Sequence, residues 1–161
     1  MRFVVMMLFA ALVVEPATAR QTSEVARCKA RTAELTVTGR RVSHFCVEVA
    51  RTEAEQAQGL MFRKSLAPNA GMIFPMTPPR FASFWMKNTL IPLDIIFIRA
   101  DGSIARVAAR TTPHSLAPVT SGEPVAAVFE IAGGRAAQLG IVAGDRVTWG
   151  RARIARERRA S

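Results

Sequence analysis

The sequence predicts a mainly β protein, built as a compact antiparallel sandwich or barrel with one or two short helices. Two observations carry this prediction. Apolar and polar residues alternate over much of the chain, which is the period of strands with one buried face. Short runs rich in β-branched and aromatic residues are also separated by turn signals. Because half of the 161 residues are hydrophobic, the chain can bury a sizeable core, which excludes wholesale disorder.

The amino terminus predicts export. Arg2 is followed by an uncharged run, Phe3–Val14, and then by Ala17-Thr18-Ala19, a pattern that signal peptidases cleave. The run is too short to span a bilayer, which needs about 20 apolar residues. We therefore expect residues 1–19 to be a signal peptide, residues 20–32 a flexible lead, and the mature protein to be periplasmic or secreted.

The two cysteines, Cys28 and Cys46, both follow the predicted signal. An oxidising compartment favours a disulfide between them, worth roughly 3 kcal/mol for a loop of this size. The alternative is a thiolate nucleophile at Cys46, since His44 two residues earlier would share its face of a strand.

The first predicted elements are a hairpin and a helix. Ala33–Thr38 and Val42–Val49 flank a Gly39-Arg40 turn, and both segments alternate as strands do. Thr52-Glu53-Ala54-Glu55 is a capping box that begins a short helix, which Gly59 can end.

The remaining elements are mostly strands. We expect them at Phe81–Met86, Leu93–Ile98, Ile104–Ala109 and Val125–Ile131. Asp101-Gly102 is the clearest hairpin turn in the chain. A second short helix, Gly134–Leu139, precedes a last strand through Val147 and Trp149, which completes a single domain at residues 33–150.

Three carboxylates, Glu48, Asp94 and Glu130, stand inside otherwise apolar strand segments. A carboxylate removed from water must be paired, hydrogen-bonded or protonated. Two acids sharing one site would raise one pKa and provide acid/base chemistry of the kind glycosidases use. The alternative is that each acid points outward from a one-sided sheet. The candidate partners by context are Arg63, Arg80, Lys87 and Asn88.

Trp85-Met86-Lys87-Asn88-Thr89 gathers an indole, a cation, an amide and a hydroxyl between two strands. An aromatic face and nearby polar groups suit a saccharide or other small molecule. A core tryptophan followed by a turn is the alternative. The two histidines are far apart in sequence, so no zinc spacing is present and we expect neither metal nor cofactor.

The formal net charge is +10, and half of it falls on the segment Arg146–Ser161. We expect residues 151–161 to be a solvated basic tail. Its alternative role is to meet an anionic membrane surface. Nucleic acid is not an expected partner, because an exported protein rarely meets it.

Several ordered stretches together resemble a known family. They are Val47-Glu48-Val49-Ala50, Gly59-Leu60-Met61-x-Arg63, Gly71-Met72-Ile73-Phe74, Phe84-Trp85-Met86-Lys87-Asn88-Thr89, Pro92-Leu93-Asp94-Ile95-Ile96-Phe97, Glu130 with Gly133-Gly134, and Gly140-Ile141 with Gly144-Asp145. Over roughly residues 34–150 the sequence resembles the bacterial and archaeal family called domain of unknown function 192. The resemblance implies a compact antiparallel β fold related to jelly-roll sandwiches, and it implies no agreed activity.

Three functions follow from these residues. The first is a non-enzymatic binding module for a small molecule or glycan end of the cell envelope. The second is a hydrolase of envelope polymers that uses paired carboxylates, and the third is a structural or interaction protein without a small-molecule site. The expected ligand-binding residues are Glu48, Arg63, Trp85, Lys87, Asn88, Thr89, Asp94 and Glu130.

Overall fold

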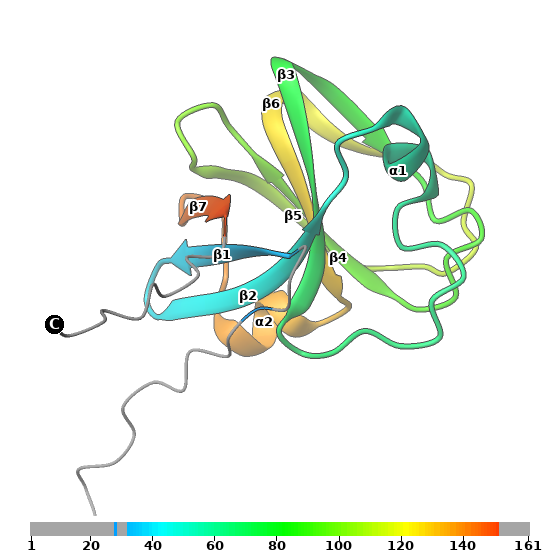
Figure 1. Ribbon diagram of the computed structural model, residues 1–161, viewed down its shortest axis with the longest axis horizontal. Coiled ribbons are helices and arrows are strands. Elements are labelled where there is room, and N and C mark those ends of the chain that lie inside the picture. Colours follow the sequence, from blue (N-terminus) through cyan, green and yellow to red (C-terminus); the bar gives the residue numbers. More distant parts are fainter. Residues whose placement is uncertain (1–27, 29–31, 152–161) are drawn as a thin grey trace, which may run out of the picture.

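The computed structural model describes Cys28 and residues 32–151. It contains seven strands and two short helices, as the sequence predicts: β1 (Ala33–Thr38), β2 (Val42–Val49), α1 (Glu53–Gln58), β3 (Ala70–Phe84), β4 (Leu93–Ile98), β5 (Ile104–Thr111), β6 (Val119–Ala132), α2 (Arg135–Leu139) and β7 (Arg146–Arg151). The strands form one curled sheet in the order β5-β4-β6-β3-β2-β1-β7 (Figure 1). The mainly β class is therefore confirmed.

The two edges of the sheet meet at one point, so the sheet is curled into a partly closed barrel. Ser103, directly before β5, forms an isolated antiparallel bridge with Arg146 at the start of β7. The amide of Ile104 donates to the carbonyl of Asp145, and the amide of Val147 donates to the carbonyl of Gly102. This contact protects part of both edge strands, whose unpaired amides and carbonyls are otherwise exposed.

Local sequence signals placed the first elements correctly. β1 and β2 pair as a hairpin with Thr38 opposite Val42. The side chain of Thr52 accepts from the amide of Glu55, while the Glu55 carboxylate accepts from the amide of Thr52, which completes the expected capping box. The turn at Asp101-Gly102 joins β4 and β5, with Gly102 at φ 85°.

β3 corrects the sequence prediction in two respects. It runs from Ala70, well before the expected start at Phe81, and its first residues pair in parallel with β2, whereas we expected antiparallel pairing. Pro75, Pro78 and Pro79 hide the strand in the sequence, because proline has no amide to donate. The structure accommodates them with a register shift between Pro75 and Arg80. Residues 50–69, including α1, form the crossover that a parallel pair requires.

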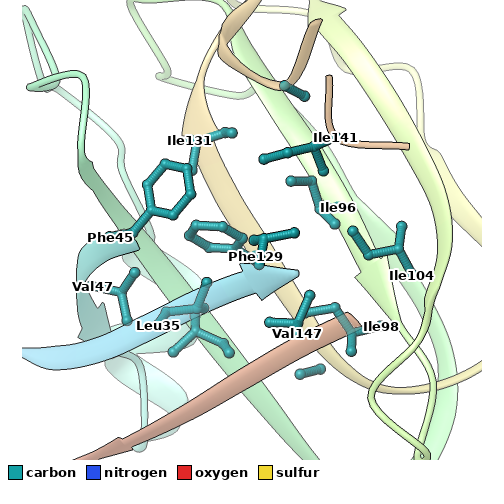
Figure 2. Close-up of a cluster of buried hydrophobic side chains, with 14 of the residues drawn as sticks. Leu35, Phe45, Val47, Ile96, Ile98, Ile104, Phe129, Ile131, Ile141 and Val147 are labelled. Atoms are coloured by element: carbon teal, nitrogen blue, oxygen red, sulfur yellow. The ribbon is translucent and has the colours of Figure 1, made fainter. Parts of the chain in front are cut away.

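Two hydrophobic clusters cover the two faces of the central strands. Inside the curl, a cluster centred on Phe45 and Phe129 packs these two rings edge to face at 5.2 Å between centroids (Figure 2). On the opposite face, a second cluster includes Phe74, Met86 and Phe97. All six residues of β4 are buried because both of its faces are covered. α1 and the long loops lie on one side of the β3–β6 ribbon, and β1, β2 and β7 lie on the other (Figure 1).

The structure contains the disulfide expected from the sequence. Cys28 and Cys46 are bonded, with 5.2 Å between their Cα atoms, and the thiolate alternative at Cys46 is therefore not realised. The bond ties Cys28 to β2. The expected signal (1–19), most of the expected lead and the tail beyond residue 151 lie outside the described residues. Within the part of the chain that is described, no helix is long and apolar enough to cross a membrane.

Candidate functional site

A pocket of about 430 Å³ opens on the face of the sheet that carries the second hydrophobic cluster. The last turn of α1 and the residues directly after it form one wall, and the second half of β3 forms another. Its lining combines aromatic and aliphatic side chains with six polar ones: Gln56, Ala57, Gln58, Gly59, Leu60, Met61, Phe74, Met76, Arg80, Phe81, Ala82, Ser83, Phe84, Trp85, Thr89 and Glu130. Small-molecule sites likewise combine apolar walls with polar groups that orient the ligand.

Glu130 is the one carboxylate among the described residues that line this pocket. On β6 it stands opposite Met72 of β3 and Ile95 of β4, so it lies in the middle of the sheet. Strand alternation turns Phe129 into the inner core and Glu130 to the pocket face. The side chain is only 5% exposed.

No hydrogen bond or ion pair to the Glu130 side chain is formed by the described residues. Every side-chain nitrogen or oxygen that is sealed in the described part of the protein does have a hydrogen-bond partner. The Glu130 carboxyl must therefore be open to the pocket. Burial raises the pKa of Glu130 to about 8, because the ionised form loses its water and gains no compensating charge. At neutral pH and without a ligand, most Glu130 carboxyls are protonated.

Asp94 of β4 precedes Ile95, the residue that pairs with Glu130, and its environment is the opposite of that of Glu130. It is fully buried, and its carboxylate accepts hydrogen bonds from the amides of Arg110, Gly134 and Ala136, each at 2.8 Å. The three bonds join β4 to the end of β5 and to the start of α2. Because Asp94 alternates with Ile95, it lies on the inner face of the sheet and not in the pocket.

Glu48 is the third acid, and it is held by Arg63. The two guanidinium nitrogens donate to the two carboxylate oxygens at 2.6 and 2.8 Å, in the bidentate geometry that gives strong pairs. Both side chains are partly exposed. Glu48 and Glu130 both stand opposite Met72, one on each side, so two strand spacings, about 10 Å, separate their Cα atoms.

The described residues bring no second carboxylate into the pocket beside Glu130. Asp94 lies on the other face of the sheet with three backbone donors, and Glu48 is engaged by Arg63. Glu130 is thus separated from both of the other acids. The partner that the sequence suggested for one of these acids, Arg63, is confirmed for Glu48.

The segment Trp85–Thr89 contributes to the pocket at its two ends. Trp85 and Thr89 line it, whereas the Lys87 ammonium lies over the Trp85 ring, 5.2 Å from the ring centroid. Asn88 takes a left-handed turn conformation with φ 56°, and its carbonyl accepts from the amide of Phe62. Of the eight residues predicted to bind a ligand, Trp85, Thr89 and Glu130 line the pocket together.

Sequence reasoning missed the wall formed by α1 and the Gly59 turn. Gly59 has φ 49° and ψ −133°, a conformation that side-chain-bearing residues rarely adopt. A Cβ added there would lie 3.9 Å from Oε2 of Glu130 and 3.4 Å from the Phe74 ring. The glycine therefore keeps the backbone close to the carboxyl. Its signals in the sequence are its position after the predicted helix and its place in the stretch Gly59-Leu60-Met61-x-Arg63.

The described residues include no group of three or more His, Cys, Asp or Glu side chains placed to hold a metal ion. The fold and pocket define a class of protein: a curled, mostly antiparallel β domain whose described residues place one buried acid in a pocket on one face of the sheet. The chain belongs to the DUF192 family, described as "Uncharacterized ACR", which matches residues 33–149 and confirms the resemblance seen in the sequence.

Two solved structures resemble the chain closely. A protein of unknown function from Novosphingobium aromaticivorans is 50% identical, with 73% of this chain and 85% of that chain covered and a TM-score of 0.72. A protein from Sinorhizobium meliloti, described as a candidate transcription regulator, is 38% identical, with 73% of this chain and 93% of that chain covered and a TM-score of 0.71. No curated protein matches the chain.

Proposed function

We propose that this chain is an exported, non-enzymatic binding module that receives a small molecule, or the end of an envelope glycan, in the Glu130 pocket. One observation carries the proposal: Glu130 is 5% exposed, and its carboxyl faces the pocket without a partner among the described residues. Such a group costs folding stability at neutral pH. Residues that cost stability gather at functional sites, where a ligand supplies the missing interaction.

The walls of the pocket support a ligand of small-molecule size. A volume of about 430 Å³ falls within the range of roughly 300 to 1,000 Å³ that such sites occupy. Trp85 and Phe81 are about half and two-thirds exposed, so aromatic surface is available at the entrance. Aromatic faces of this kind stack on the apolar faces of sugars and on other flat or apolar ligands.

Export is supported by two independent features. The signal-like amino terminus ends in Ala17-Thr18-Ala19, and the disulfide between Cys28 and Cys46 suits an oxidising compartment. Expression of the full chain in a bacterial host, followed by mass spectrometry of the periplasmic fraction, tests this. We expect a chain that begins at Arg20 and contains no free thiol, and an unprocessed cytoplasmic chain would contradict export.

The binding proposal is tested by a thermal-shift screen of the protein recovered from the periplasm. The compounds are envelope sugars, peptidoglycan fragments, lipid headgroups, amines and metal salts. A ligand at a hundred times its dissociation constant stabilises by about 2.7 kcal/mol, which corresponds to a shift of several degrees.

Two variants make the screen specific. Glu130→Gln removes the pocket acid, and Glu48→Gln is the matched control, since it changes the same side chain outside the pocket. We expect a ligand to stabilise the parent and the control and to lose that effect in Glu130→Gln. The proposal is contradicted if no compound stabilises the parent, or if every stabilising compound acts equally on Glu130→Gln.

A further inference from the structure

We propose that the ligand carries a protonated amine, whose nitrogen pairs with the Glu130 carboxylate while an apolar remainder lies against Trp85 and Phe81. This inference rests on the proposed binding function and names its ligand class. It follows from what surrounds the carboxyl: among the described residues no cation pairs with it, and the pocket has aromatic walls.

The charged groups near the pocket leave Glu130 uncompensated. Arg80 is the one basic side chain among the described lining residues, and it is exposed at the edge of the pocket. Lys87 lies over Trp85. Arg63 is engaged by Glu48 of β2, and β3 separates β2 from the strand that carries Glu130. His114, in the loop after β5, meets the pocket segment through its backbone amide, which donates to the Thr89 carbonyl. Burial is the cause of the raised pKa of Glu130, with no neighbouring charge contributing.

The carboxyl end of α1 adds a second negative feature. Peptide carbonyls at the end of a helix carry partial negative charge, and the last turn of α1 contains no basic side chain to offset it. This turn lines the pocket through Gln56, Ala57 and Gln58. Gly59 follows directly, and because it lacks a side chain the space beside Oε2 of Glu130 remains open. A cationic nitrogen entering here meets the Glu130 carboxyl beside a helix end that carries no basic side chain.

The aromatic walls suit the same ligand. Phe74 and Phe84 pack edge to face at 5.1 Å between centroids, and both line the pocket beside Trp85 and Phe81. Ring faces attract cations, and the Lys87 ammonium over Trp85 shows the same attraction within the protein. Desolvating an ammonium group is costly, and the carboxylate supplies the compensation that aromatic rings alone do not.

Binding of such a ligand must change the protonation of Glu130. The amine arrives as an ammonium ion and Glu130 begins as a neutral carboxylic acid at pH values below about 8. In the complex the ammonium retains its protons, the carboxyl becomes a carboxylate, and its proton passes to the solvent. Close to one proton is therefore released for each amine bound in mildly acidic solution, and the affinity for amines rises with pH.

The experiment is titration calorimetry of benzylamine into the periplasmic protein at about pH 6.5, in two buffers with different ionisation enthalpies. The difference in heat between the buffers counts the protons released. Benzyl alcohol is the matched neutral ligand, since it keeps the ring and replaces the ammonium with a hydroxyl. We expect benzylamine to bind at least tenfold more tightly than the alcohol and to release close to one proton.

Variants locate the site. Glu130→Gln should lower benzylamine affinity at least tenfold and abolish proton release, whereas Glu48→Gln should change neither. Equal affinity for the amine and the alcohol, or benzylamine binding without proton release, overturns the ligand class. If other compounds still stabilise the parent through Glu130 in the thermal-shift screen, the binding function stands and only this inference fails. The proton count uses the parent protein, so this test holds even where a variant folds poorly.

Discussion

Asp94 and Glu130 are both buried carboxylates in central strands of one sheet, yet their surroundings are opposite. Asp94 accepts from three backbone amides at 2.8 Å, and Glu130 has no partner among the described residues. The first lies on the inner face of the sheet, and the second opens onto a pocket. Asp94 holds elements of the fold together, whereas Glu130 is the acid at which we propose that a ligand binds.

The largest expected effect is at Asp94. Replacing Asp94→Ala leaves three backbone amides without their acceptor and should lower the free energy of unfolding by about 4 kcal/mol, given the strength of hydrogen bonds to charged groups. Urea denaturation measures the change. Asp94→Asn is the control, because its amide oxygen can keep part of the network and should lose less. A loss below about 1 kcal/mol in Asp94→Ala would show that this acid is not the structural one of the pair.

Glu130→Gln should act in the opposite direction and stabilise the protein. Between pH 4.5 and about 8 the unfolded chain releases the Glu130 proton while the folded protein keeps it, so the stability of the parent falls as pH rises through this range. Glutamine has no proton to lose. The variant should therefore gain about 3 kcal/mol over the parent near pH 7 and almost nothing near pH 4.

Thermal melts of the parent and Glu130→Gln across this pH range measure the effect. Glu48→Gln, melted in parallel, controls for the general loss of a negative charge. If the difference in melting temperature between the parent and Glu130→Gln does not depend on pH, the pKa of Glu130 is not raised by burial in the pocket.

Gly59→Ala tests the backbone that approaches Glu130. At φ 49° and ψ −133° an alanine is strained, and the expected cost is about 2 kcal/mol. Gly140→Ala is the matched control: its φ of 71° also disfavours alanine, but its added Cβ meets no atom within 4 Å. Denaturation of both variants, together with benzylamine titration, separates strain from function. Only Gly59→Ala should also weaken amine binding, and equal binding by both variants would remove Gly59 from the site.

The smallest expected effect is at the partly exposed pair of Glu48 and Arg63. Exposed ion pairs contribute little because water already solvates both charges. Glu48→Gln should cost about 1 kcal/mol or less in urea denaturation, and less again at high salt. A cost as large as that of Asp94→Ala would mean that this pair, too, is a structural element.

Local signals in the sequence placed much of the fold correctly. The hairpin of β1 and β2 and the capping box at Thr52 depend on neighbouring residues, so their pattern is visible in the chain itself. The parallel pairing of β2 with β3 depends on a crossover of residues 50–69, and no pattern of neighbouring residues indicates it. The prolines of β3 made its first half look unlike a strand. The register shift that accommodates them arises in the pairing with β6, which cannot be seen in the sequence of β3.

The candidate site was visible only in part. The sequence showed that Glu48, Asp94 and Glu130 stand in apolar segments, but their partners lie far away in the chain. Asp94 is satisfied by backbone amides, which carry no residue-type signal, and two of these belong to residues about forty positions later. Arg63 could be guessed for Glu48, since it is a cation. That Glu130 has no partner in the described part of the chain can be seen only once the sheet is assembled.

The most direct test of the account is the titration of the Glu130 carboxyl itself. The side-chain carboxyl carbons of the glutamates can be followed by ¹³C NMR as a function of pH, and the signal absent from Glu130→Gln identifies the pocket residue. We predict a midpoint near pH 8 for this signal in the ligand-free protein, and a lower midpoint when benzylamine is present. A midpoint near the ordinary value of 4.5 in the ligand-free protein would mean that a partner or water already compensates Glu130, and would contradict an unpaired acid in the pocket.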